Sequence, residues 1–535
     1  MAQKVFLRDA TGLVREFGIF DTIWINLALV GVFFSLTYVA STAPLIGGDP
    51  LLGGLFAVFF MFIVAVAFSI VSILTPRTAG DYVFTSRYLH PALGFVGNAG
   101  YFAATVPLFM GITIITLESF GLSALFAYLG LATGNASYLS WASLLGQPTY
   151  EFAVGGSLTV LAAILPLFGY SVFKTLSKVI LPLILVAVAV MFFVLGTTPQ
   201  SVALARLSSL SGNPTLVQSV NTWGATNNSP APSFTDWGNT LALNAVYAVG
   251  FTYIISAIYV AGEVRQVRKT MPAAIIATLF ITFVIFGGAT ILSYQTFGYN
   301  FLSNLYAESI VSAATPFPAG VVPYLEFLAA AISNNVAIGA FIIIVATIQL
   351  WWYQANAVFI GSRLLLSYSF DRIAPYAFGE LSPRFHAPIK GMIACLAIGM
   401  IAGVFFLLPS TSAVAFLMSG AASAILLLFP MAVVGVALLT FRFKWAKEYN
   451  ASPIAKSYLG GPVYLIAAVV TVLYSLYTFY QFISVPAIFG SAGTEGLETI
   501  FVPIILLFAF YFVSRFIGTR KGADFKLIFS QIPPE

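Results

Sequence analysis

Long apolar segments recur along this chain, and most are long enough to cross a lipid bilayer. A spanning helix needs about 20 mostly apolar residues, because the hydrocarbon core is about 30 Å thick and each helical residue rises about 1.5 Å. Hydrophobic residues make up 60% of the 535 positions and charged residues 8%, whereas a soluble domain is about 25% charged. Lipid offers the backbone no hydrogen-bond partner, and these runs lack the two-residue alternation of barrel strands. The sequence therefore predicts an all-α polytopic membrane protein.

Twelve membrane spans are predicted from these runs. They cover residues 20–43, 53–74, 93–120, 151–172, 176–196, 239–262, 273–297, 336–362, 390–408, 413–440, 462–484 and 500–518. Residues 319–331 are ambiguous, and we expect a packed loop with a short helix there. The longer connections cover about residues 121–150, 197–238 and 298–335. Sequons at Asn135 and Asn227 lie in the first two, and the sequence leaves their glycosylation open.

The positions of lysine and arginine predict the orientation. In short loops these residues favour the cytoplasmic side of a membrane. When both termini are placed in the cytoplasm, 22 of the 23 lysine and arginine residues lie on that side, and Arg206 alone lies outside. We therefore expect a multi-pass protein of the cell membrane with cytoplasmic N- and C-termini. The same asymmetry explains the net charge of +5, so the lipid bilayer rather than nucleic acid is the expected partner.

Residues that support catalysis or metal binding are scarce. Cys395 is the single cysteine and lies within an apolar run, which excludes a disulfide framework. His90 and His386 are far apart in the sequence and flank prolines or loops. We therefore expect no enzyme activity, no catalytic residues, no metal site and no bound cofactor.

Three polar stretches follow predicted spans on the cytoplasmic side. The first is TPRTAGDYVF at 75–84, which continues to LHPALGF at 89–95; the second is AGEVRQVRKTMP at 261–272; the third combines SR at 362–363, FDRIAP at 370–375 and RFHAP at 384–388. Together and in this order they resemble the amino acid/polyamine/organocation superfamily of permeases, and are similar to prokaryotic, including archaeal, amino acid permeases. The resemblance covers about residues 10–440, and the last two spans carry no such signature.

The resemblance implies a leucine-transporter-type core of two five-helix repeats with inverted topology. It assigns helices 1–5 to residues 20–196, helices 6–10 to residues 239–440 and two additional helices to residues 462–518. The segments that remain are a cytoplasmic N-terminal segment at 1–19, an extracellular loop at 197–238, a cytoplasmic loop at 441–461 and a cytoplasmic tail at 519–535.

In such a fold the first helix of each repeat is broken near mid-membrane, where half-helix ends bind substrate. Unpaired N–H groups favour a carboxylate, and freed carbonyls favour an ammonium group. Candidate breaks lie at 28–33 and 247–253, although the family's first helix carries a glycine-small-glycine run and this chain has only Gly31. The alternative is that Gly31 and Gly250 permit close helix packing. The predicted substrate-binding residues are Asn26, Ala28, Val30, Gly31, Tyr101, Tyr247, Gly250, Tyr253 and Ser256.

Glu263 ends the sixth span beside several basic residues. We hypothesise that it pairs with Arg77 or Arg363 to latch a cytoplasmic gate, and Arg77 and Asp81 are themselves gate candidates. The alternative for each is a solvated surface charge, whose ion pairs contribute about 0–1 kcal/mol.

The implied function is a secondary active transporter that moves amino acids across the cytoplasmic membrane by alternating access, with substrate between helices 1 and 6. The alternatives are transport of another small metabolite, such as a polyamine, a nucleobase or an organic amine, and a transporter-like solute sensor. The spans contain few acids, which favours a zwitterion over a polyamine. The sequence leaves open which amino acid is carried, the direction of net transport and the oligomeric state.

Coupling to H+ or Na+, or exchange of solutes, also stays open. Glu118 and Glu151 lie near the ends of predicted spans, where anchoring at the membrane interface is the favoured interpretation. Some proton-coupled relatives carry a lysine within the fifth helix, whereas residues 182–194 here are uncharged.

Overall fold

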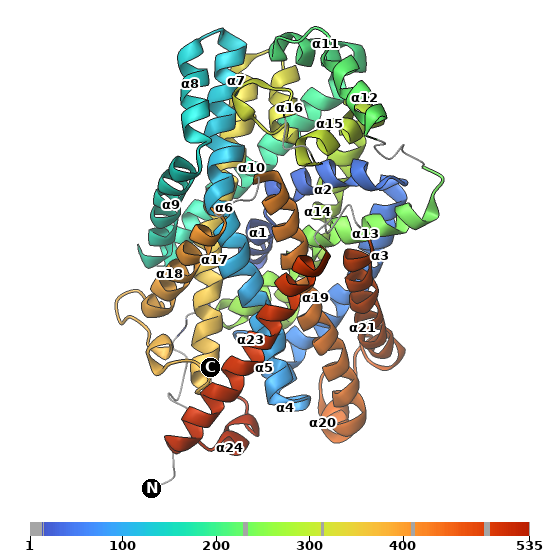
Figure 1. Cartoon of the computed structure of the whole chain (residues 1–535). Helices are drawn as coiled ribbons and strands as arrows, with labels where there is room; N and C mark the ends of the chain where they lie inside the picture. The colour runs from blue at the N-terminus through green and yellow to red at the C-terminus, as the bar shows by residue number, and fades with distance from the viewer. Residues whose placement is uncertain are drawn as a thin grey trace.

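The computed structural model describes residues 13, 15–168, 170–227, 234–311, 315–407, 412–485 and 493–533, and regular structure within them is helical (Figure 1). One isolated β-bridge joins Phe17 to Val264. Most of the predicted N-terminal segment lies outside this part of the chain.

Helices occupy all twelve predicted spans. In chain order they are α1 (Ile19–Val30) with α2 (Val32–Ile46); α3 (Pro50–Leu74); α5 (Pro91–Ala103), η1 (Ala104–Met110), α6 (Gly111–Thr116), η2 (Leu117–Leu122) and α7 (Ser123–Thr133) as one continuous span; α9 (Pro148–Ile164) with η3 (Leu165–Phe168); α10 (Tyr170–Thr197); α13 (Trp237–Phe251) with η4 (Thr252–Glu263); α14 (Val267–Phe297); α17 (Val336–Phe370); α18 (Ile389–Phe405); α19 (Ser412–Lys444); α21 (Gly461–Ser484); and α23 (Gly493–Arg520).

Length and composition support a membrane location for these helices. Within the described residues, ten helices are at least 18 residues long and apolar enough to cross a membrane. The pair α1 and α2 passes the same test together, and α18 is a shorter apolar helix of 17 residues. The prediction of an all-α polytopic membrane protein is confirmed.

Shorter helices cover the two ends of the bundle (Figure 1). One end carries α4 (Gly80–Tyr88), α20 (Ala446–Ala451) and α24 (Phe525–Phe529). The other carries α8 (Ala136–Leu145), α11 (Gln200–Ser211), α12 (Leu216–Thr226), α15 (Tyr299–Val311) and α16 (Leu325–Ile332). We name the first end the basic face, since it holds Arg87, Lys174 and Arg363, and the second the opposite face. Helix α16 is the short helix expected near residues 319–331.

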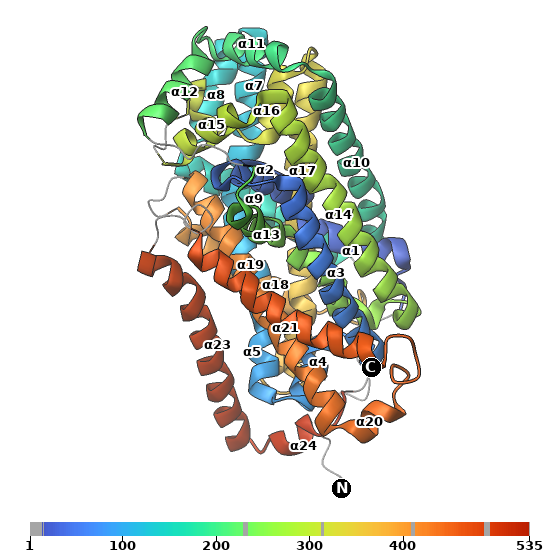
Figure 2. The ribbon, with the colours of Figure 1, turned by 90° about the vertical axis from the view of Figure 1, so that its right-hand side faces the viewer.

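Among the ten long apolar helices, the sixth span is the most buried and the twelfth the least. The most apolar window of Trp237–Glu263 is 94% buried, whereas that of Phe501–Arg520 is 6% buried. Figure 2 shows α23 along the outside of the bundle, reaching α24 at the basic face. Burial on all sides places the sixth span at the centre of the molecule, beside α1, which packs against η4.

The third span is longer than predicted. It continues from Pro91 to Thr133 instead of ending near residue 120. The residues after 122 form α7, whose largely apolar sequence extends the helix at the opposite face. Glu118 therefore lies inside a helix and not at its outer end.

Candidate functional site

The first span breaks at Gly31. Its φ and ψ are both 64°, and α1 and α2 meet there with a bend of 44°. Glycine adopts this left-handed conformation without the steric cost of a Cβ. The break leaves backbone groups without intrahelical partners at the end of α1 and the start of α2, inside a buried bundle. The predicted break in residues 28–33 is therefore present.

Two side chains contact the backbone groups that the break leaves. Ser35 Oγ donates to the carbonyl of Val30 at 2.5 Å. The N–H of Phe34 donates to Oε1 of Gln349, from α17, over 3.4 Å. Good N–H···O bonds measure about 2.7–3.2 Å, so Gln349 holds this N–H weakly. Its carboxamide oxygen lies where the start of α2 favours an anion.

The sixth span changes its helix type instead of breaking at glycine. Helix α13 continues through Gly250 to Phe251, and from Thr252 the backbone tightens into the 3₁₀ helix η4, with Val260 as its one non-helical residue. A Cβ on Gly250 would lie 2.3 Å from the ring of Phe286. The change of helix type at Thr252 falls within the candidate break at 247–253. Gly250 itself stays in regular helix, so the packing alternative holds at that residue.

Tyr247 lies away from the break. Its hydroxyl donates to the carbonyl of Pro50 at 3.1 Å, and a Cβ on Gly54 would lie 3.0 Å from its ring. Tyr247 therefore fixes the sixth span against α3, whereas a substrate-binding role was predicted for it.

Asn26 connects three elements beside the break. Its Oδ1 accepts from the N–H of Ala257 in η4 at 2.7 Å, and its Nδ2 donates to the hydroxyl of Thr278 in α14 at 3.3 Å. Ala28 and Val30 follow it in α1 and are at most 2% exposed. These contacts hold α1 against η4 at the level of the break.

An aromatic layer forms where η4 packs against the third span and α17. Tyr101 donates from its hydroxyl to Ser256 Oγ at 2.5 Å, and its ring centroid lies 5.9 Å from that of Tyr253. Phe109 and Tyr353 extend this layer, since the ring of Phe109 lies 5.8 Å from Tyr253 and 4.6 Å from Tyr353. The structure thus brings Tyr101, Tyr253 and Ser256 together and adds two residues that the sequence did not single out.

Polar side chains of α17 donate hydrogen bonds to backbone carbonyl groups in an irregular part of the third span. Its segment η1 is π-helical and contains Pro107, which has no N–H to donate. Tyr353 donates from its hydroxyl to the carbonyl of Thr105, and Gln354 donates from Nε2 to that of Met110, both at 3.2 Å. The sequence predicts that polar residues at this depth face the protein interior, but π-helical turns have no comparable sequence signature.

At the basic face, Glu263 forms a buried ion pair with Arg363. Nε and Oε1 are 2.9 Å apart, and neither side chain is more than 5% exposed. The guanidinium lies 3.7 Å from the ring centroid of Phe359, and the N–H of Phe17 donates to the carbonyl of Glu263 at 2.9 Å. The structure therefore pairs Glu263 with Arg363, the second of the two hypothesised partners, and excludes a solvated surface charge.

Asp81 lies in a second buried cluster at this face. Its Oδ2 accepts from Nδ2 of Asn98 at 2.9 Å and from the hydroxyl of Tyr259 at 3.4 Å. Asn98 in turn accepts from the hydroxyl of Tyr368 at 2.5 Å. Burial raises the pKa of the Asp81 carboxyl to about 6, against the opposing effect of the hydrogen bond from Asn98. The cluster connects α4 to α5, η4 and α17.

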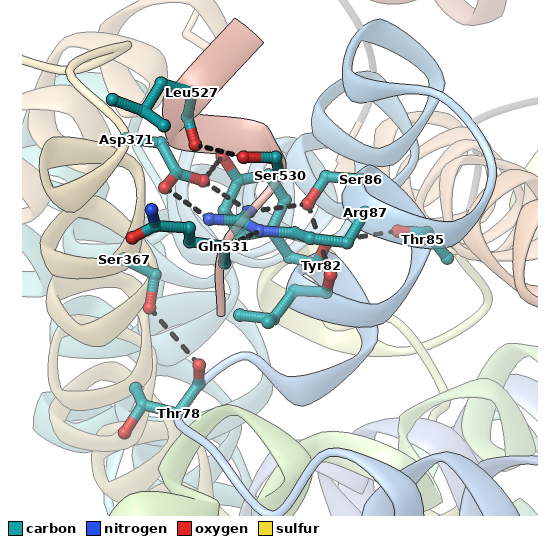
Figure 3. A network of polar contacts seen from close by, with 11 residues as sticks. Thr78, Tyr82, Thr85, Ser86, Arg87, Ser367, Asp371, Leu527, Ser530 and Gln531 are labelled. Atoms are coloured by element: carbon teal, nitrogen blue, oxygen red, sulfur yellow. Dashed lines mark hydrogen bonds and ion pairs between the residues drawn. The ribbon is translucent and has the colours of Figure 1, made fainter. Parts of the chain in front are cut away.

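Arg87 connects the first and third sequence motifs (Figure 3). Its guanidinium makes two hydrogen bonds of 2.6 Å to Asp371, which also accepts from the hydroxyl of Tyr82 at 2.5 Å. Nε of Arg87 donates to the carbonyl of Gln531 at 3.1 Å, and the ring of Phe529 lies 5.1 Å from the guanidinium. Sequence reasoning missed this pair, although opposite charges in two motifs were a signal for it. Arg77, in contrast, forms a backbone hydrogen bond to Thr75 in the turn before α4.

Helix α16 covers the break from the opposite face. Glu326 accepts from the hydroxyl of Thr37 in α2 at 2.6 Å. The ring centroids of Phe120 and Tyr324 are 3.7 Å apart, and Phe120 stacks on Phe34 at 6.3 Å. These contacts join α16 to both α2 and the third span, so the break is closed from this side.

Glu118 and Glu151 do not anchor the protein at a membrane interface. Their exposed fractions are 0% and 8%, because η2 lies within the buried third span and Glu151 is on the buried side of α9. The interpretation favoured by the sequence is therefore wrong for both residues.

A multi-span helical bundle whose first helix breaks at an enclosed polar and aromatic site is the architecture of a solute transporter. The chain belongs to the amino acid permease family, whose sequence profile matches residues 21–527. Among curated proteins, none matches the chain. Family and fold together define a multi-pass membrane protein that transports amino acids or related organocations.

Proposed function

We propose that the protein is a secondary transporter that moves amino acids across the cell membrane by alternating access, with substrate bound at the break beside η4. The observation that carries this proposal is the left-handed Gly31 in a buried span. It supplies N–H groups at the start of α2 for a carboxylate and carbonyls at the end of α1 for an ammonium group. A zwitterion matches both ends of this arrangement.

Gln349 is the residue that a substrate carboxylate displaces. Its amide oxygen makes only a 3.4 Å hydrogen bond to Phe34, which a charged oxygen replaces with a shorter and stronger one. Tyr101, Tyr253 and Ser256 then face the remainder of the substrate from the third and sixth spans. In this scheme Asn26 positions α1 against η4 without contacting substrate.

The two closed faces are the gates of the cycle. The pair Glu263–Arg363 and the Arg87–Asp371 contact hold the basic face, and the Glu326–Thr37 contact holds the opposite face. Alternating access requires that the two sets open in turn. The basic face is the cytoplasmic one in this proposal, since lysine and arginine concentrate there.

Uptake into proteoliposomes tests the function. We expect amino acids, and not polyamines or nucleobases, to accumulate or exchange when a panel of all three is offered under imposed proton or sodium gradients. Gln349→Ala is expected to retain transport, with a changed KM, because the N–H groups of α2 remain. Absence of uptake and exchange for every amino acid would overturn the proposal.

Thiol labelling tests the orientation. Cys395 is buried, so Cys395→Ser gives a background without cysteine. In intact cells, an impermeant reagent is expected to label Ser209→Cys of α11 and to leave Ser530→Cys beside α24 unlabelled. The reverse pattern would overturn the assignment of the basic face to the cytoplasm.

A further inference from the structure

Three carboxyl groups lie buried beneath the opposite face, and the proposed function assigns a gate contact to one of them alone. Glu118 comes from η2, Glu151 from α9 and Glu326 from α16, and they are 0%, 8% and 1% exposed. Glu118 and Glu151 lie close enough for the charge of one to act on the other. Tyr324 lies within electrostatic range of both Glu151 and Glu326, so the three groups belong to one region.

The hydrogen bonds of this region do not support three negative charges. Glu326 accepts one side-chain hydrogen bond, from Thr37. Both carboxyl oxygens of Glu118 are buried without a hydrogen-bond partner among the described residues. Such a group inside a protein binds a proton in preference to remaining ionised. It also lies in a π-helical segment of a membrane span, and ionisable groups in spans and π-helical turns both concentrate at functional sites.

No cation neutralises these groups in the described part of the chain. Arg206, from α11, donates to the carbonyl of Ile332 at the end of α16. The titratable groups that pack around α16 include the phenols of Tyr128, Tyr306 and Tyr324. A phenol donates a hydrogen bond but carries no positive charge. Neutrality in this conformation therefore has to come from bound protons.

We propose that Glu118 is the proton-binding residue of the transporter, and that the opposite face closes only after Glu118 has taken up a proton from that side. Glu151 lies close to Glu118, and Glu326 joins α16 to α2 when the face closes. This inference rests on the proposed function for its role in transport, but not for the binding of the proton.

A proton needs fewer ligands in this region than a divalent metal ion does. Among the described residues no group of three or more acidic, histidine or cysteine side chains is placed to hold a metal ion. A sodium ion requires several oxygen ligands at one point, whereas a proton requires one carboxyl group. Burial also raises the pKa of the Glu326 carboxyl, to about 7, against the hydrogen bond from Thr37.

A labelling experiment tests this without any substrate. In the Cys395→Ser background, Ala329→Cys lies on α16 at a position that is 0% exposed. Labelling is expressed relative to that of the exposed Ser209→Cys at the same pH, because the reactive thiolate fraction itself increases with pH. With wild-type Glu118, this relative labelling from the opposite face is expected to increase severalfold between pH 5 and pH 8, as ionised carboxyls hold the face open. With Glu118→Gln, labelling is expected to stay at its low-pH value throughout. Glu118→Asp keeps a titratable group and is expected to keep the dependence.

Transport supplies the second readout. With Glu118→Gln, exchange of amino acid is expected to persist while stimulation of uptake by acid on the opposite face is lost. Equal pH dependence of labelling in Glu118→Gln and wild type would overturn the inference, as would labelling of the wild type that responds to sodium and not to pH. If no amino acid is transported but labelling behaves as expected, the proposed function fails and the proton site stands.

Discussion

At the scale of single residues, two glycines in similar surroundings have opposite roles. Gly31 has a φ of 64°, and a Cβ there would lie 3.6 Å from its nearest atom. Glycine is therefore required by the left-handed backbone conformation and not by lack of room for a side chain. Gly250 has ordinary helical geometry but no space for a Cβ. The sequence presents both as glycines near the middle of a span, and only the backbone distinguishes a break from a packing contact.

Gly31→Ala tests the break. A left-handed alanine costs about 1–2 kcal/mol, so we expect the variant to fold and its KM for amino acid to increase by about 5- to 30-fold. Gly212→Ala is the matched control, because Gly212 also has a positive φ, 69°, with nothing within 4 Å, and lies at the end of α11. KM from uptake and the melting temperature are the measurements. An equal effect of both variants on KM would contradict the role of Gly31.

Glu263→Gln tests the gate pair. The change leaves Arg363 buried without its charged partner, which costs the closed basic face about 3–5 kcal/mol. Labelling of Phe359→Cys, which is 2% exposed beside Arg363, is therefore expected to increase at the basic face. Glu263→Gln with Arg363→Gln removes both charges and is expected to restore part of the protection. The exposed pair of Lys390 and Glu380 is the control, and Glu380→Gln is expected to change nothing. Unchanged labelling in Glu263→Gln would argue against a gate.

At the scale of elements, α4 connects several segments at the basic face. Asp81 and Arg87 lie on this nine-residue helix, and each takes part in a different network. Their partners come from α5, η4, α17 and the C-terminal tail. The sequence predicts the helices themselves from their long apolar runs. Contacts such as that of Arg87 with Asp371 join residues 284 positions apart, and no local pattern encodes such a pairing. This is why the spans were predictable and the networks between them were not.

The packing of α4 is expected to weaken as pH rises. The pKa of Asp81 is raised from 3.8 to about 6 in the folded protein, so its protonated form contributes stability that is complete below about pH 4 and is lost as pH increases through about 6. Hydrogen exchange in residues 80–88 is therefore expected to become faster from pH 4 to pH 7, after correction for intrinsic exchange. Asp81→Asn is expected to show no such change, and a persisting change would contradict the assignment to Asp81.

The tail helix α24 is expected to stabilise the Arg87 network. A chain that ends at Ala523 loses the carbonyl of Gln531 and the ring of Phe529, which we expect to destabilise the basic face by about 1–3 kcal/mol. Faster hydrogen exchange in α4 and a lower melting temperature are the measurements. Phe529→Leu keeps the backbone contact and is expected to have a smaller effect than truncation. Exchange in α4 that is the same with and without the tail would exclude this role.

At the scale of the whole molecule, the non-glycine residues in the left-handed conformation concentrate at one face. In the part of the chain that the structure describes, the non-glycine residues with positive φ are Ala79, Gln266, Arg372 and His386. Each lies in one of the three motifs that resemble permeases, and all lie at the basic face. The three motifs thus coincide with tight turns of the backbone, whereas the buried acids of the opposite face lie within helices.

The weak attachment of α23 has a mechanical consequence. Its 28 residues extend about 42 Å, well beyond the roughly 30 Å of a hydrocarbon core, so its tilt follows the thickness of the surrounding lipid. The rest of the molecule does little to resist this, since only 6% of its apolar window is buried. Residues 521–524 connect the helix directly to the tail that contacts Arg87. A change in bilayer thickness therefore changes the tilt of α23 and transmits force to the basic face through residues 521–524. The core helices of the transporter have no such connection to this helix.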